Sequence, residues 1–342
     1  MVYSFELIKH ANIRYRDSLP ALACCELFTM LFSLGIQCEI VLESAGGSCF
    51  LSFDCRELTD RELSYLSGHS AVVFIAEKYD GLLKPLSVAS PAYLPDDLPE
   101  ILKYKGKTSV TFTRMMINTA VALSSFHAQD PQLVFFDPLC GKGTGCFCAL
   151  TAGMNAVGMD IDKKDIREAS DYFSRYLQFH RLKHTVKSRS ETVSGHAIPL
   201  TIYSFAPDKD RYCSGDTRSL TLACGDTYNA PSLFRKSKAH IIVADLPYGI
   251  QHAPQSGTKP ESLRFFLSRV LPSWKNALYP GGVLAVSYNT LTLSTVDVRA
   301  ALTKTGFTLP KNEMFSHLSH EVEHAVVRDV VFALNTEEES FI

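Results

Sequence analysis

The sequence predicts an α/β protein in two parts: a small mixed unit at the N-terminus and a larger unit built on an open, mostly parallel sheet. Three observations lead to this prediction. Strand and helix patterns follow the order β-α-β-β-α-β over residues 1–78, a proline-rich segment covers residues 79–107, and buried strands alternate with helices from residue 133 onward. Such alternation is typical of a sheet with helices on both faces. A chain of 342 residues is long enough for two or three domains.

Short apolar runs separated by turn residues define the N-terminal unit. We expect strands at 2–8, 38–42, 49–53 and 71–76 and helices at 20–34 and 59–66. The first helix has apolar residues at helical spacing and stops at Gly35, and the pair Gly46-Gly47 marks a hairpin. Thr59 and Glu62 have the spacing of a capping box. This order predicts a ferredoxin-like domain over residues 1–78.

The remainder of the chain predicts a linker and a doubly wound sheet. Residues 79–107 contain four prolines and little periodicity, so we expect a linker there. A helix is predicted at 113–125. Further strands are expected at 133–136, 155–160, 219–226, 240–249 and 281–289, helices at 163–182, 261–278 and 295–305, and a C-terminal β-hairpin at 307–314 and 325–334. Residues 108–342 should therefore form a Rossmann-like sheet with ligands at the carboxyl ends of its strands.

One polar stretch, residues 183–218, fits no element of that sheet. Its only strand-like piece is the segment 201–207. We expect an insertion between the second helix and the third strand of the sheet.

Composition and charge exclude several classes of protein. Lys and Arg number 34 against 36 Asp and Glu, a net charge of −2, which excludes a protein that holds nucleic acid by bulk positive charge. The ten cysteines form no C-x-x-C pair, so neither a zinc ribbon nor a thioredoxin-like site is indicated. No apolar run reaches the length of about 18 residues that a membrane helix needs, and Glu6 interrupts any signal peptide. We expect an intracellular, cytoplasmic protein.

The first chemical signal is a glycine-rich loop, Asp137 to Gly145, which reads DPLCGKGTG. It follows a buried strand and opens a helix, where backbone N–H groups are free to contact a ligand and glycine permits close approach. The loop lacks the Gly-Lys-Ser/Thr ending of a phosphate-binding Walker loop and does not match the nicotinamide pattern G-x-G-x-x-G. A simple tight turn between strand and helix is the alternative reading.

Two carboxylates follow at the ends of the next strands. Asp160 ends the second strand of the sheet, where it could accept both ribose hydroxyls of a nucleoside. Its alternative role, capping the next helix, could be filled by Asp162. Asp226 ends the third strand, where it could accept from an adenine amino group or form an Asx turn.

The fourth signal, Asp245-Leu246-Pro247-Tyr248-Gly249, ends the fourth strand. Asp245 and the Leu246 carbonyl could both accept from an exocyclic amine of a planar base, and Tyr248 could stack on its ring. Two acceptors would direct the nitrogen lone pair at an electrophile, so that orientation alone supplies much of the rate. A plain Pro-Tyr-Gly turn is the alternative.

Together these motifs resemble class I S-adenosylmethionine (SAM)-dependent methyltransferases, in particular the THUMP-containing tRNA guanosine N2-methyltransferases. The resemblance covers about residues 105–335 and includes DPLCGKGT, GMDID, DLPYG, the lead-in GKTSVTFTRMMINTA and the late segment HLSHEVEHAVVRDVVFAL. It implies SAM as the cofactor and Asp245, Leu246, Pro247 and Tyr248 as the catalytic segment. It also implies a cofactor site of Asp137, Pro138, Cys140, Gly141, Gly143, Thr144, Asp160, Ile161, Asp226 and Thr227.

The chain departs from that family before the catalytic segment. Between residues 78 and 108 there is no room for a THUMP domain, and residues 1–107 hold ten Lys/Arg against fourteen Asp/Glu, which does not attract a phosphate backbone. One basic run could contact nucleic acid or could be a solvated helix end: Arg181, Lys183, Lys187 and Arg189. Some members of the family work with a small activating zinc-finger protein, and the resemblance extends that expectation to this chain.

The sequence thus predicts an enzyme that methylates an exocyclic amine of a nucleic-acid base, with guanine N2 in tRNA or another structured RNA favoured by the resemblance. Adenine N6 in DNA, a small or protein-borne amine, and a non-catalytic SAM-binding scaffold stay open as alternatives. His317, His320 and His324 lie before the last strand without cysteine partners, so we expect a loop near the substrate mouth and no metal site.

Overall fold

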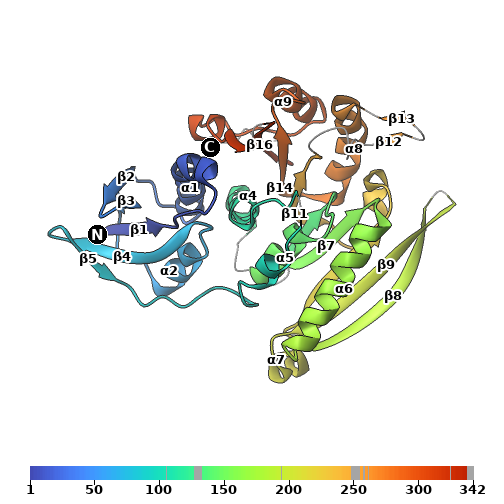
Figure 1. Cartoon of the computed structure of the whole chain (residues 1–342), viewed down its shortest axis with the longest axis horizontal. Helices are drawn as coiled ribbons and strands as arrows, with labels where there is room; N and C mark the ends of the chain where they lie inside the picture. The colour runs from blue at the N-terminus through green and yellow to red at the C-terminus, as the bar shows by residue number, and fades with distance from the viewer. Residues whose placement is uncertain are drawn as a thin grey trace.

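The computed structural model describes residues 1–104, 106–126, 133–193, 195–247, 255–256, 259–260, 262–323 and 325–336. Two large sheets organise the chain, one of five strands and one of nine (Figure 1). A two-stranded ribbon of β12 (Gln255–Ser256) and β13 (Lys259–Pro260) is separate from both. No helix among the described residues is both long and apolar enough to cross a membrane.

The N-terminal sheet has the order β2-β3-β1-β4-β5, and β1 pairs antiparallel with both β3 and β4. Its elements are β1 (Val2–Leu7), α1 (Ile13–Ser33), β2 (Ile40–Ala45), β3 (Ser48–Asp54), α2 (Asp60–Ser67), β4 (Val72–Tyr79) and β5 (Leu82–Pro85). The predicted element order is confirmed. The strand β5 is additional, and it lies in the segment that was expected to be a linker, as does the short helix α3 (Leu98–Ile101).

Helix α1 begins seven residues before the predicted start. The Asn12 side chain accepts hydrogen bonds from the backbone N–H groups of Arg14 and Tyr15, and Pro20 lies inside the helix. Proline favours the first helical position, which is why the prediction began there. An asparagine cap is a stronger start signal, because it satisfies backbone donors that would otherwise lack partners.

The nine-stranded sheet has the order β15-β16-β14-β11-β6-β7-β10-β9-β8. Its strands are β6 (Val134–Asp137), β7 (Asn155–Asp160), β8 (Lys183–Val193), β9 (His196–Ala206), β10 (Arg218–Cys224), β11 (Ala239–Asp245), β14 (Leu278–Asn289), β15 (His320–Glu323) and β16 (Val326–Leu334). The five central strands, β14, β11, β6, β7 and β10, are parallel, and β16 runs antiparallel to β14. The predicted doubly wound sheet is confirmed, and a C-terminal hairpin is present, but its first strand is β15 and not the predicted segment 307–314.

Helices cover both faces of this sheet. They are α4 (Val110–Leu123), α5 (Thr144–Thr151), α6 (Lys163–Phe179), α7 (Lys209–Ser214), α8 (Leu263–Ala277), α9 (Thr295–Lys304) and two 3₁₀ turns, η1 (Thr227–Ser232) and η3 (Glu313–Ser316). Adjacent residues of β6 show the two faces. Phe135 packs in a core with residues of α4, α5 and α6, while Phe136 packs in a second core with residues of α8 and α9. Side chains of a strand point to alternate faces, so β6 contributes side chains to both cores.

Two predictions for this sheet were wrong. Residues 183–218 are not an insertion outside the sheet, because β9 pairs antiparallel with β10 and β8 with β9. Residues 307–314 are not a strand; β15, at His320–Glu323, is the partner of β16. In the first case exposure of β8 on both faces removes the alternation that marks a strand. In the second, Phe307 is a buried apolar residue of a coil segment.

The N-terminal unit and the large sheet share one hydrophobic core. Helix α1 packs against α4 and β15, and buried residues of both units belong to one cluster, among them Leu27 and Phe112. A polar link crosses the same boundary, where Asn118 Nδ2 of α4 donates to Glu26 Oε1 of α1 at 2.7 Å and to the Gly68 carbonyl at 2.9 Å. Glu26 is fully buried. The first unit is therefore fixed against the side of the sheet that carries α4.

Candidate active site

The glycine-rich loop connects β6 to α5 as predicted. Asp137 ends β6 and is 8% exposed, and Gly141 and Gly143 adopt positive φ angles of 47° and 89°. A Cβ atom at Gly145 would collide with the Asp137 carboxylate. Glycine at these positions therefore permits both the loop conformation and the close packing of the carboxylate against the start of α5.

Asp160 joins the end of β7 to this loop. Its Oδ2 accepts from the Gly141 N–H at 2.8 Å and its Oδ1 from the Asp162 N–H at 2.9 Å. Burial raises the pKa of Asp160, and the hydrogen bonds from Asp162 and Gly141 oppose that shift. Asp162 itself caps α6, so the capping alternative is taken by its neighbour and Asp160 faces the loop. Each carboxylate oxygen retains a second lone pair for a ligand hydroxyl.

Three carboxylates at strand ends lie close to one another. Burial raises the pKa of Asp137 to about 8, and the neighbouring Asp245 and Asp160 carboxylates contribute to the rise. Burial raises the pKa of Tyr104 to about 12. The hydrogen bond between the Tyr104 and Thr144 hydroxyls opposes the rise, and the carboxylates of Asp137 and Asp245 add to it. Like charges held together in a buried place favour a cationic ligand, because a cation relieves their repulsion.

Asp245, the last residue of β11, is held by two groups from other parts of the chain. The Thr108 hydroxyl donates a short hydrogen bond to Oδ2, and Arg328 Nη2 lies 3.9 Å from the same oxygen. Arg328, on β16, is 4% exposed, and its guanidinium lies 5.2 Å from the centre of the Phe112 ring. The Leu246 N–H donates to the Ser287 carbonyl at 2.8 Å, which fixes the chain just beyond the strand.

Other predicted residues fall into three groups. Pro138, Cys140 and Leu246 are buried, Pro247 is half-buried and Ile161 is 69% exposed. The thiol of Cys140 lies beside Gly158, beneath the loop, so only its backbone faces a ligand. Tyr248 and Gly249 of the predicted motif lie outside the described residues.

Asp226 follows β10, the strand beside β7, which ends at Asp160. Its Oδ1 accepts from the Tyr228 N–H at 2.9 Å, the Asx-turn geometry, and Arg269 Nη1 lies 3.2 Å from Oδ2. The neighbouring Thr227 is buried and accepts from Trp274 Nε1 at 2.8 Å. Asp226 follows the end of β10, whose next residue, Gly225, donates its N–H to the Asp160 carbonyl. The four predicted carboxylates thus lie at or just beyond the carboxyl ends of four neighbouring parallel strands, β11, β6, β7 and β10.

Sequence reasoning missed three residues of this site: Tyr104, Thr108 and Arg328. Tyr104 donates or accepts a hydrogen bond with Thr144 Oγ1 at 2.8 Å, and its ring lies 5.1 Å from Lys142 Nζ. Thr108 lies in the lead-in segment that carries part of the resemblance, but nothing in its residue type indicates a contact with Asp245. Arg328 did carry one, because Arg328 and Asp329 form a charged pair inside an otherwise apolar strand.

Of the three histidines before the last strand, the structure describes His317 and His320, and their surroundings differ. His317 is exposed and His320 is buried between the rings of Tyr15 and Phe112. Burial lowers the pKa of His320 to about 4. His324 lies outside the described residues.

No protein-family model matches the chain, and no curated protein matches it. Among solved structures the chain is similar to TrmN from Thermus thermophilus, with 16% identity, a TM-score of 0.41, and coverage of 87% of this chain and 59% of that one. It therefore spans less than two thirds of the length of TrmN.

Two other solved structures are similar to a smaller part of the chain. Human methyltransferase-like protein 13 in complex with SAH has 14% identity, a TM-score of 0.38, and coverage of 68% of this chain and 85% of that one. Magnesium protoporphyrin IX methyltransferase from Synechocystis with bound SAM has 15% identity, a TM-score of 0.36, and coverage of 67% and 86%. All three similarities are distant, and the strand order described above defines the fold of this chain without them.

Proposed function

We propose that the chain is a SAM-dependent methyltransferase that acts on an exocyclic amine of a nucleic-acid base, with guanine N2 of tRNA or another structured RNA as the acceptor. One observation carries the proposal. Asp245, at the end of β11, lies near the carboxylate of Asp137, which also lies near that of Asp160, and Asp245 is held there by Thr108 and Arg328. The acceptor specificity rests on the motif DLPYG and its resemblance to guanine N2-methyltransferases.

The loop and the carboxylates fit the cofactor. SAM supplies an electrophilic methyl group on a positively charged sulfonium sulfur. Glycines at 141, 143 and 145 allow the backbone of the loop to approach a ligand. Asp137 and Asp160 place carboxyl groups at the ends of adjacent strands, and a bound cation would favour the ionised form of Asp137, whose pKa burial raises. Asp160 would accept from the ribose hydroxyls with its remaining lone pairs. Asp226 and Ile161, which is 69% exposed, would contact the adenine.

Asp245 would orient the acceptor amine. Its carboxylate and the Leu246 carbonyl accept hydrogen bonds from the amine, which directs the nitrogen lone pair towards the methyl carbon. As the new N–C bond forms and the S–C bond breaks, the nitrogen loses one proton, and the Asp245 carboxylate is placed to accept it before it passes to water. Thr108 and Arg328 hold the carboxylate in one orientation during this exchange.

Transfer of a labelled methyl group from SAM to total RNA tests the proposal. The wild-type chain should label RNA, and Asp245→Ala should lower the rate at least about a hundredfold. Mass spectrometry of the digested RNA should then find the label in N2-methylguanosine. Equal transfer by Asp245→Ala would contradict the assigned role, and label in another nucleoside would overturn the acceptor.

A different acceptor is the second candidate. The same pair of hydrogen-bond acceptors would suit adenine N6 or a small amine, and the net charge of −4 over residues 1–107 favours an uncharged or smaller substrate. Parallel assays with DNA and with a protein extract separate these acceptors from RNA. Absence of transfer to any acceptor, with SAM still bound, would favour a non-catalytic scaffold. A zinc-finger partner, proposed from the resemblance alone, would be recognised by activation in trans.

A further inference from the structure

The outermost strand of the large sheet, β8, has an unusual exposure. It is 11 residues long, forms the edge of the sheet, and pairs only with β9 among the described strands. Most of its residues are exposed. Figure 1 shows the β8–β9 ribbon running beside α6 to a tip that projects beyond the sheet. A strand that buries so little apolar surface contributes little to the core, so its length calls for another explanation.

Cations gather on one face of β8. Lys183, Lys187 and Arg189 are all exposed and odd-numbered, so their side chains share one face of the strand, as the strand period of two requires. At about 3.3 Å per residue, this row is about 20 Å long. Residues 180–206 hold four Lys/Arg and one Glu, a net charge of +3 in a chain whose total is −2.

The β8–β9 ribbon runs along the full length of the parallel strands. Lys183 pairs with Ala206 near the amino ends of the parallel strands, where β10 begins. Arg189 pairs with Leu200, which pairs with Ala223, whose partner is Met159. Arg189 is therefore level with the carboxyl ends of the strands, one residue before Asp160. The basic row therefore begins near the amino ends of the parallel strands and reaches their carboxyl ends, where the candidate active site lies.

We propose that the basic face of the β8–β9 ribbon binds the phosphate backbone of the RNA substrate, a proposal that rests on the proposed function. Five strand spacings of about 4.8 Å separate β11 from β8, so the contact lies about 24 Å from Asp245. A structured RNA reaches that far from its target base, whereas a nucleoside or a short fragment does not. The ribbon thus selects large RNA substrates by charge, while the strand ends select the base.

Edge protection alone does not explain the row. Lysines on an edge strand deter pairing with other strands, but that effect needs neither a single face nor a single sign of charge. One counter-charge is present, since Arg189 Nη2 lies 3.4 Å from Glu191 Oε1. Both side chains retain exposure, 59% and 28%, and such surface ion pairs contribute little, so a phosphate can replace the carboxylate.

Charge reversal on the ribbon tests this inference. The double variant Lys187→Glu/Arg189→Glu is compared with the control Arg235→Glu/Lys236→Glu. The control makes the same charge change at exposed residues before the amino end of β11, away from the candidate active site. Binding of bulk tRNA is measured between low and moderate salt. For the ribbon variant we expect at least a tenfold rise in Kd, roughly, and a loss of about 1.5 from the slope of log K against log salt. The control should match the wild type.

A second readout separates failure of this inference from failure of the proposed function. The ratio of kcat/KM for tRNA to kcat/KM for a dinucleotide, which is too short to reach the ribbon, should fall about tenfold in the ribbon variant. If the wild type methylates RNA and both variants share its tRNA slope and ratio, the ribbon inference is overturned and the function stands. If the wild type transfers nothing to RNA, the proposed function fails first. A changed oligomeric state with an unchanged tRNA slope would make β8 a protein interface and also overturn the inference.

Discussion

At the scale of single residues, Arg328 connects the C-terminal strand to the chemistry of Asp245. It is 4% exposed, stacks on Phe112 and approaches Oδ2 of Asp245. Its planar guanidinium can contact the carboxylate, the Thr108 hydroxyl and an aromatic ring at once, which a lysine cannot do. The contact with Asp245 therefore explains why a positively charged residue, Arg328, lies in a strand that is otherwise rich in valine.

We expect substitution of Arg328 to lower kcat for methyl transfer more than it raises KM for SAM. Arg328→Lys should lose about tenfold and Arg328→Ala about a hundredfold, because a carboxylate displaced by about 1 Å loses rate on that scale. Millimolar guanidinium ions should partly restore the alanine variant. Wild-type kcat in a folded Arg328→Ala protein would show that Asp245 needs no such support.

The raised pKa of Asp137 predicts that SAM binding releases a proton. Burial raises its pKa to about 8, so at pH 7 most molecules carry the protonated carboxyl. A cation beside it favours the carboxylate, hence SAM binding should release close to one proton per site at pH 7. The release should vanish well above pH 8, where Asp137 is already ionised.

Calorimetric titrations in two buffers of different ionisation enthalpy measure this release. The apparent binding enthalpy should differ between the buffers for the wild type and not for Asp137→Asn. Equal heats for the wild type at pH 7 would show that Asp137 does not meet the cofactor's positive charge.

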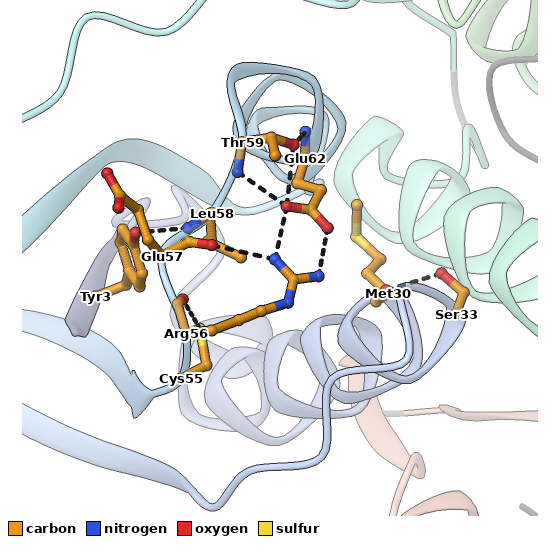
Figure 2. A network of polar contacts seen from close by, with 9 residues as sticks. All are labelled: Tyr3, Met30, Ser33, Cys55, Arg56, Glu57, Leu58, Thr59 and Glu62. Atoms are coloured by element: carbon orange, nitrogen blue, oxygen red, sulfur yellow. Dashed lines mark hydrogen bonds and ion pairs between the residues drawn. The ribbon is translucent and has the colours of Figure 1, made fainter.

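At the scale of elements, the start of α2 shows a local signal that determines structure by itself. Figure 2 shows the Glu62 carboxylate accepting from the Thr59 N–H at 2.8 Å and from Arg56 Nη1 at 3.0 Å. The Thr59 hydroxyl in turn accepts from the Glu62 N–H, which completes the predicted capping box. The hydrogen bond from Arg56 lowers the pKa of Glu62 to about 2, and the Thr59 N–H contributes.

The capping box should therefore stabilise the protein in a pH-dependent way. A carboxylate with a depressed pKa stabilises the folded state above its unfolded pKa, and this contribution is lost as pH falls from about 4.5 towards 2. Glu62→Gln should lower the free energy of unfolding by about 1 kcal/mol at pH 7 and by much less near pH 2. Glu57→Gln, an exposed neighbour, is the control. A pH-independent effect of Glu62→Gln would contradict the account.

The elements also show how far sequence patterns extend. The buried parallel strands were predicted because each is a short apolar run next to a helical pattern, and the glycine loop and strand-end aspartates followed from them. Strand β8 was missed because its pairing with β9, and not its burial, makes it a strand. Strand β9 was predicted only in part, as the strand-like segment 201–207. The position of Asp226 just beyond a strand end is visible in sequence, whereas its contact with Arg269 depends on α8 packing nearby.

At the scale of the whole molecule, the N-terminal unit and the large sheet behave as one body. Their shared core and the bond between Glu26 and Asn118 were not predictable, because the linker pattern indicated separate domains. Helix α1 also contacts β15, the neighbour of the strand that carries Arg328. The small unit therefore supports the wall of the candidate site.

Thermal unfolding should reflect this shared core. We expect a single cooperative transition in calorimetry, with Asn118→Ala lowering the free energy of unfolding by about 1–3 kcal/mol because Glu26 loses a buried donor. Asn276→Ala, on the far end of α8, serves as the control. Two separate transitions, or an unchanged stability in Asn118→Ala, would show that the units fold independently.

The central claim is that Asp137, Asp160 and Asp245 line one cofactor and acceptor site at the carboxyl ends of the strands. Calorimetric titration of SAM into the wild type, Asp160→Ala and Asp245→Ala tests it most directly. We predict binding by the wild type, at least about tenfold weaker binding by Asp160→Ala, and retained binding by Asp245→Ala, since that residue faces the acceptor. No measurable SAM binding by the wild type, or equal affinity in Asp160→Ala, would contradict the claim.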